Sequence, residues 1–121
     1  MGTLNLSSNG VVRNLAVDGL KNSHQTCKAW IYFDGSGTVG INSSFNVSSL
    51  TDLGTGDYKV SFTNNMSSAN YAVAGSSHIW SSYLSTIRAE TTSVDSVNIE
   101  VIENARADSD HVHAIIFGAG V

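Results

Sequence analysis

Two histidines near the end of the chain are the residues whose type and spacing best suit chemistry. His111 and His113 stand one residue apart at the start of the apolar segment HVHAIIF. Positions i and i+2 of a β-strand point to the same face, so both imidazoles are expected side by side. Neutral imidazole nitrogens are common ligands of transition metals, so the pair is one candidate for a metal site. The alternative is a histidine pair at a strand end, exposed or hydrogen-bonded to Asp108 or Asp110.

A second candidate site lies in the polar segment SSHIWSSYL at residues 76–84, which contains His78, Trp80 and Tyr83. Exposed aromatic rings can stack on the apolar C–H face of a sugar, and Trp and Tyr are frequent anchors in binding sites. We therefore predict that these three residues contact a ligand. The 76–86 loop and the 104–110 turn are the predicted contact regions. The alternative is that Trp80 packs at the edge of a sheet.

Two further motifs are better explained as turns. The segment DSDH at residues 108–111 brings Ser, His and Asp together, but a catalytic triad is defined by its three-dimensional arrangement, and no G-x-S-x-G motif is present. The segment GSGTVG at residues 35–40 has the glycine spacing of a dinucleotide site. A phosphate site needs a helix to begin there, whereas the following INSSF favours a strand. No catalytic residue is predicted.

β-strands must position these side chains, because alternation of apolar and polar residues runs along most of the chain after residue 26. The segment AWIYF places Ala29, Ile31 and Phe33 on one face and Trp30 and Tyr32 on the other. The same alternation in SFNVSSL predicts that Phe45 and Val47 face the core. Turns such as Asp34–Gly37 and Asp52–Gly56 separate the segments, and their glycines can adopt positive φ. An all-β fold with an antiparallel β-sandwich is expected.

Composition and charge exclude several classes of protein. The 121 residues include only 13% charged residues but 41% hydrophobic residues, so a core can form beneath a surface of hydroxyls and amides. A net charge of −4 with scattered Lys and Arg argues against nucleic acid binding. No apolar run approaches the length of a membrane span, so membrane insertion is not expected. Residues 1–26 have few large side chains and are interpreted as a β-rich stem, and residues 27–121 as the head domain.

The residues of the head carry a resemblance to a known family. The segment from Cys27 to Gly75 includes C-K-A-W-x-x-F, then SFNVSS, then TDLGTGDYKVSFT, then ANY. This pattern resembles a segment recurrent in the C-terminal regions of bacteriophage tail fibres. The closing apolar strand, Val112 to Phe117, also fits the family, whereas the His pair is not usual in it.

The resemblance implies a homotrimeric fibre tip in the virion tail, assembled in the host cytoplasm and extracellular after lysis. Its partner would be a polysaccharide or an outer-membrane component of the host cell surface. If His111 and His113 face the three-fold axis, three chains present six imidazoles. Six nitrogen ligands favour one octahedral Fe, Ni or Co ion for each trimer.

Two other functions remain open at this point. A tailspike-type enzyme that degrades polysaccharide would need a pair of carboxylates across a cleft. The nearby supply for such a pair is Glu90, Asp95, Glu100 and Glu103. A purely structural fibre segment, with the receptor-binding tip on another chain, is the second alternative.

Overall fold

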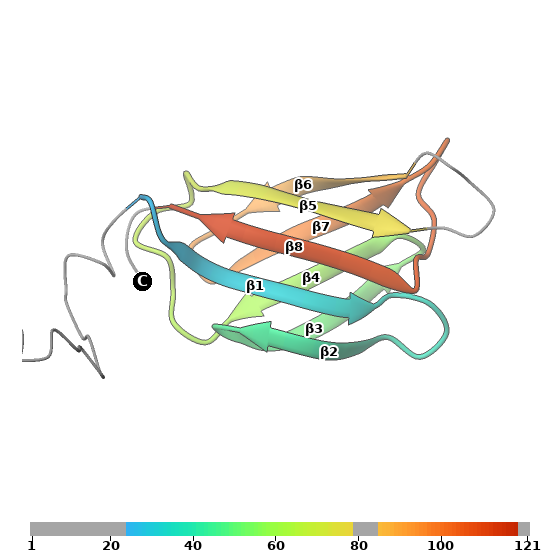
Figure 1. The fold of residues 1–121 in the computed structure, drawn as a ribbon, viewed down its shortest axis with the longest axis horizontal. Helices are drawn as coiled ribbons and strands as arrows, with labels where there is room; N and C mark the ends of the chain where they lie inside the picture. Colours follow the sequence, from blue (N-terminus) through green and yellow to red (C-terminus); the bar gives the residue numbers. More distant parts are fainter. Residues whose placement is uncertain (1–23, 79–84, 119–121) are drawn as a thin grey trace, which may run out of the picture.

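The structure, a computed structural model, describes residues 24–78 and 85–118. These residues form eight β-strands and no helix (Figure 1). The strands are β1 (Cys27–Asp34), β2 (Gly40–Phe45), β3 (Val47–Gly54), β4 (Asp57–Phe62), β5 (Ala72–His78), β6 (Thr86–Thr92), β7 (Ser96–Ile102) and β8 (His111–Phe117). No helix in the described part of the chain is long and apolar enough to cross a membrane.

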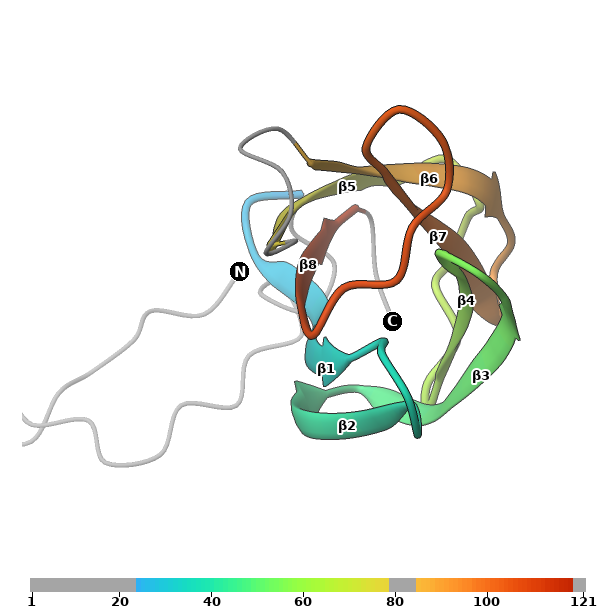
Figure 2. The same ribbon diagram turned by 90° about the vertical axis from the view of Figure 1, so that its right-hand side faces the viewer.

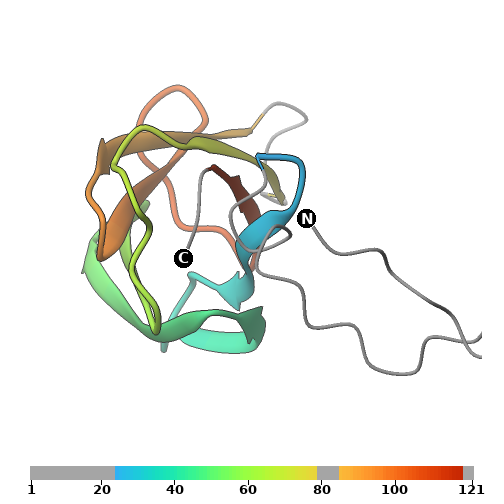
Figure 3. The ribbon, with the colours of Figure 1, turned by 90° about the vertical axis from the view of Figure 1, so that its left-hand side faces the viewer.

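The strands form two four-stranded sheets with the orders β2-β1-β8-β5 and β3-β4-β7-β6. Every pairing within them is antiparallel. Figures 2 and 3 look along the molecule from its two ends and show the sheets facing each other. The predicted all-β antiparallel sandwich is therefore confirmed for a single chain.

The predicted stem, 1–26, falls almost entirely outside the described residues. Among the described residues, the first strand begins at Cys27, and the boundary between stem and head stays a prediction.

The core lies between the sheets and follows the alternation of the sequence. On β1, Ala29, Ile31 and Phe33 are buried, as predicted, while Trp30 and Tyr32 point outward. The opposite sheet contributes alternate residues in the same way, and the rings of Phe33 and Tyr58 meet edge to face at 5.0 Å. The other large core side chains are Val60, Phe62, Met66, Val97, Ile99, Val101, Val112 and Ile116.

The chain passes from one sheet to the other at Asn46, and here the sequence prediction was wrong in part. SFNVSSL is not one strand, because Asn46 adopts φ of 57° and separates β2 from β3. Alternation does not continue across such a break. Phe45 consequently faces outward and is 53% exposed, whereas Val47 packs against the core.

The two glycine-containing segments form turns, as predicted. GSGTVG connects β1 to β2, with positive φ at Gly37, and carries no helix. β3 extends further than predicted and leaves a short turn before β4, with positive φ at Gly54 and Gly56. A Cβ on Gly56 would lie 2.5 Å from the amide nitrogen of Ala107, so this glycine also permits a close approach of two backbones.

Two tyrosine hydroxyls, those of the buried Tyr58 and the partly buried Tyr71, tie the connecting segments to the sandwich. Tyr58 donates to the carbonyl of Gly35 at 2.7 Å and to a carboxylate oxygen of Asp108 at 3.1 Å. Tyr71 donates to the carbonyls of Ser93 and Ser96, each at 2.9 Å. The segment between β7 and β8 is therefore held against the end of the sandwich at which β8 begins.

Candidate functional site

The two histidines of β8 lie on the outer face of the sheet β2-β1-β8-β5. Along this strand Val112, Ala114 and Ile116 are buried, so the side chains between them point to solvent. His111 and His113 share that face, as their spacing predicted, and both are exposed. The six-imidazole arrangement in a trimer stays a prediction.

Pairing of β5 with β8 adds a third histidine to the same place. His78 pairs with His111, and Ser76 pairs with His113. An open depression of about 520 Å³, called here the histidine depression, is lined by Ser76, Ser77, His78, His111 and His113. His78 of the predicted ligand site is thus brought next to the predicted metal pair, although it is more than thirty positions from that pair in the sequence. Trp80 and Tyr83 lie outside the described residues.

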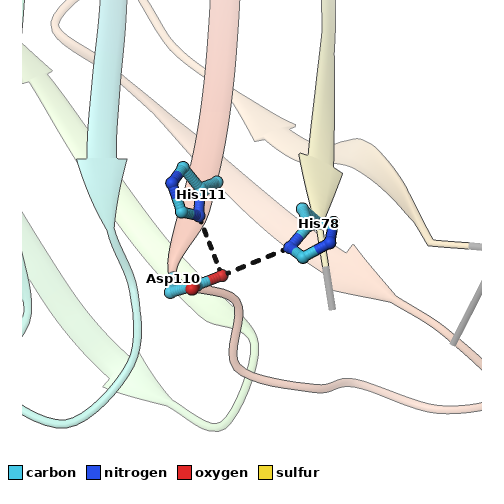
Figure 4. A group of neighbouring side chains, drawn as sticks. All are labelled: His78, Asp110 and His111. Carbon is cyan, nitrogen blue, oxygen red and sulfur yellow. Dashed lines mark ion pairs between the residues drawn. The ribbon is translucent and has the colours of Figure 1, made fainter. Parts of the chain in front are cut away.

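Asp110 lies between two of these histidines, as Figure 4 shows. Its Oδ1 atom is 3.0 Å from Nδ1 of His111 and 3.6 Å from Nδ1 of His78. The rings of His78 and His111 are nearly perpendicular, with centroids 5.9 Å apart. The sequence prediction named Asp110 only as an alternative hydrogen-bond partner of the pair, and the structure places it at the centre of the group.

Ser109 fixes the backbone beneath this group. The side chain is buried, and its Oγ donates to the carbonyls of His78 and His111, the second at 2.9 Å. The amides of His78 and His111 lie in turn 3.2 Å from the same oxygen, each as a donor. One hydroxyl therefore joins the end of β5 to the start of β8. Asp108, Ser109 and Asp110 form an irregular segment that leads into β8 at His111, and these residues position the histidines.

The ring of His113 stacks closely on Tyr32 of β1, whereas the ring of His111 lies farther from Tyr32, with centroids 6.0 Å apart. The centroids of the His113 and Tyr32 rings are 4.3 Å apart and the planes differ by 2°. Tyr32 was not predicted as a site residue. Its place on the outward face of AWIYF was visible in the sequence, but the β1–β8 pairing that sets it opposite His113 was not.

A carboxylate, Asp34 at the end of β1, belongs to the same surface. The side chain and backbone amide of Ser36 donate to its Oδ1 at 2.7 and 2.8 Å, and these bonds hold the pKa of Asp34 below its usual value. Asp34 is therefore ionised at neutral pH. The surface around the histidines offers carboxylates, imidazoles and hydroxyls, which suit both metal ions and sugar hydroxyls.

Exposed apolar side chains adjoin this polar surface. Phe45, Trp30 and Ile115 lie opposite one another on β2, β1 and β8, and they are 53%, 36% and 43% exposed. We call these three residues the apolar row. Large apolar groups gathered on one face are typical of an interaction surface.

The carboxylates considered for polysaccharide cleavage lie on β6, on β7 and in the segments next to β7. Glu100 is fully buried, and its oxygens accept hydrogen bonds from Arg88 and Arg106. Arg106 also lies 3.3 Å from Glu90. Asp95 accepts hydrogen bonds from the hydroxyls of Ser93 and Ser96. These contacts commit the three carboxylates to ion pairs and turns.

Comparison of the chain with protein-family models, with curated proteins and with solved structures finds no match.

Proposed function

We propose that this chain is the receptor-binding head of a homotrimeric bacteriophage tail fibre, located in the virion tail. It would bind a polysaccharide or another component of the host outer membrane without covalent chemistry. The observation that carries the proposal is the histidine depression, which combines hydroxyls, imidazoles and a neighbouring aromatic ring on a sheet face. The resemblance of the segment from Cys27 to Gly75 to phage tail-fibre tips supports the same function.

The chemistry of the depression suits a carbohydrate. Its volume of about 520 Å³ falls within the range of small-ligand sites. Ser76 and Ser77 offer hydroxyls that can donate to and accept from sugar hydroxyls. The stacked rings of Tyr32 and His113 offer a flat surface for the C–H face of a pyranose.

The homotrimer is part of the proposal, and the apolar row is the proposed contact between chains. Because Phe45, Trp30 and Ile115 are neighbours, their exposed side chains form one apolar patch. Such a patch is more typical of a protein contact than single exposed apolar residues are. Three linked heads would present three depressions to one cell surface. Such linkage raises the overall affinity by about 10²–10⁴ without any new contact, so weak single sites are sufficient.

Binding of the purified full chain to an array of bacterial lipopolysaccharides and capsular polysaccharides tests this function. We expect selective binding that Tyr32→Ala weakens about tenfold for each site, which corresponds to the loss of one stacked ring. Thr51→Ala, on the exposed part of β3, is the matched control and should leave binding unchanged. Trp80→Ala and Tyr83→Ala belong in the same assay, because both residues were predicted to contact the ligand.

Two outcomes would replace the proposal. A trimer that binds none of the polysaccharides and no bacterial cells would instead be a structural fibre segment. Cleavage of a polysaccharide that Glu90→Gln abolishes would make the chain an enzyme.

A further inference from the structure

We propose that His78, Asp110 and His111 of each chain bind one divalent transition-metal ion, with Zn²⁺ preferred. The site lies within one chain and excludes His113. It differs in this respect from an axial site made by His111 and His113 of three chains. The inference is independent of receptor binding, although both concern the histidine depression.

The positions of the ligand atoms fit such an ion. Two ligands of a tetrahedral zinc at its usual bond lengths lie about 3.3–3.5 Å apart. Asp110 Oδ1 lies 3.0 Å from His111 Nδ1 and 3.6 Å from His78 Nδ1. One ligand atom from each of the three side chains lies within 4.8 Å of the others. The two imidazoles therefore need to approach each other only slightly, by rotation about side-chain bonds, to share an ion with the carboxylate.

The backbone holds these ligands in advance. His78 and His111 are directly paired on neighbouring strands, and Ser109 contacts the backbone of both. Asp110 is adjacent in sequence to His111, so its distance from that ring is set locally. The His78 and His111 side chains are about half exposed, at 51% and 47%, so an ion in solvent can reach them. Ordered ligands on paired strands reduce the entropic cost of binding.

The donor set selects the class of metal. Two imidazole nitrogens with one carboxylate oxygen form a ligand set typical of zinc and of non-haem iron, whereas Ca²⁺ and Mg²⁺ prefer oxygen ligands alone. Three protein ligands leave a fourth position of zinc open. Since His78 and His111 line the depression, this position would face water or a ligand bound there. His113 is left out because the group of nearby ligand atoms consists of His78, Asp110 and His111, and because its ring lies closer to Tyr32, at 4.3 Å, than the ring of His111 does, at 6.0 Å.

Calorimetric titration of the full chain with Zn²⁺, after removal of metal by a chelator, tests the proposal. We expect one ion for each chain, in the wild type and in His113→Ala alike. His78→Ala and Asp110→Asn should each weaken binding by more than the roughly 10–100-fold that loss of an outer-shell partner costs. A melting temperature that rises with Zn²⁺ in the wild type and in His113→Ala, but not in His78→Ala, is the second expected result.

Melting of the metal-free variants checks their fold, and Asp110→Asn preserves side-chain size in case His78→Ala perturbs β5. Absence of zinc binding at micromolar concentrations would overturn the proposal. One ion for every three chains, lost in His113→Ala and retained in His78→Ala, would overturn it as well and would support the axial site. Neither result would change the expected binding of polysaccharide by the wild type, so the two proposals fail separately.

Discussion

A single amide side chain, that of Asn46, holds the point where the chain leaves one sheet for the other. Its φ of 57° is a conformation that Asn adopts more readily than most residues. Its Nδ2 group donates to the carbonyls of Lys28 and Asn64, each at 3.1 Å, and its Oδ1 accepts from the amide of Asn64 at 2.8 Å. The conformation and the hydrogen bonds are both needed at this position, and Asn supplies them together.

Replacement of Asn46 by Ala and by Gly separates these two contributions. Asn46→Ala should lower the free energy of unfolding by about 3 kcal/mol, because it loses the hydrogen bonds and strains the backbone. Asn46→Gly loses the same hydrogen bonds but tolerates positive φ, so it should cost about 1 kcal/mol less. Urea denaturation of both variants measures the difference. Equal destabilisation would mean that the backbone conformation contributes little.

At the scale of elements, an ion-pair group joins three strands of the second sheet to the segment before β8. Glu100 on β7 pairs in register with Asp57 on β4 and Arg88 on β6, and Arg106 reaches the same carboxylate from the following segment. Burial alone would raise the pKa of Glu100, but the hydrogen bonds from Arg88 and Arg106 outweigh it and lower this pKa. The folded state therefore favours the ionised carboxylate.

Acid should weaken the fold through this group. The pKa of Glu100 in the folded chain lies below its ordinary value of 4.5, so its contribution to stability is complete above about that pH. The contribution is lost as the pH falls through the lower, folded value. We expect Glu100→Gln to be less stable at pH 7 by on the order of 2 kcal/mol, the size of a hydrogen bond to a charged group.

Denaturant unfolding of wild type and Glu100→Gln between pH 3 and pH 7 measures this effect. The difference between the two proteins should shrink as the pH falls. It should not account for all of the acid sensitivity, because the pKa values of Asp34 and Asp95 are also lowered. A difference that stays constant over this range would contradict the ionised state of Glu100.

The elements also show which features the sequence could predict. Alternation correctly placed Ala29, Ile31 and Phe33 inside and put both β8 histidines on one face, because period-two patterns depend only on neighbouring residues. It failed at Phe45, where the backbone of the next residue changes direction. The meeting of His78 with His111 depends on pairing between β5 and β8, which no local pattern encodes.

At the scale of the whole molecule, one sheet carries both the proposed contact between chains and the proposed ligand site. The ion-pair group of Glu100 lies on the other sheet. The apolar row and the histidine depression share the outer face of β2-β1-β8-β5. His113 and Ile115 are only two residues apart on β8. A contact between chains along the apolar row would therefore bring the depressions of neighbouring heads to its border.

A charge introduced into the apolar row should separate the chains of the proposed trimer. We expect Ile115→Glu to be monomeric at micromolar concentration by light scattering, because three carboxylates would be buried in the contact. Leu53→Glu is the matched control, since Leu53 is similarly exposed but lies on β3 of the other sheet. Circular dichroism should show the same β-sheet content in both. A trimeric Ile115→Glu variant would place the contact elsewhere.

The tyrosines that anchor the connecting segments also give the sandwich an optical signal in alkali. Burial, with the charge of Asp108, raises the pKa of Tyr58, and burial raises the pKa of Tyr71 to about 12. An unfolded phenol ionises near pH 10, so the stabilisation from both groups is complete below about that pH and is lost as the pH rises through the folded values. Two of the four tyrosines should therefore ionise late in an ultraviolet titration, together with the loss of β-sheet circular dichroism. Alkaline unfolding of this protein would thus be read directly from phenolate absorbance, without any added dye.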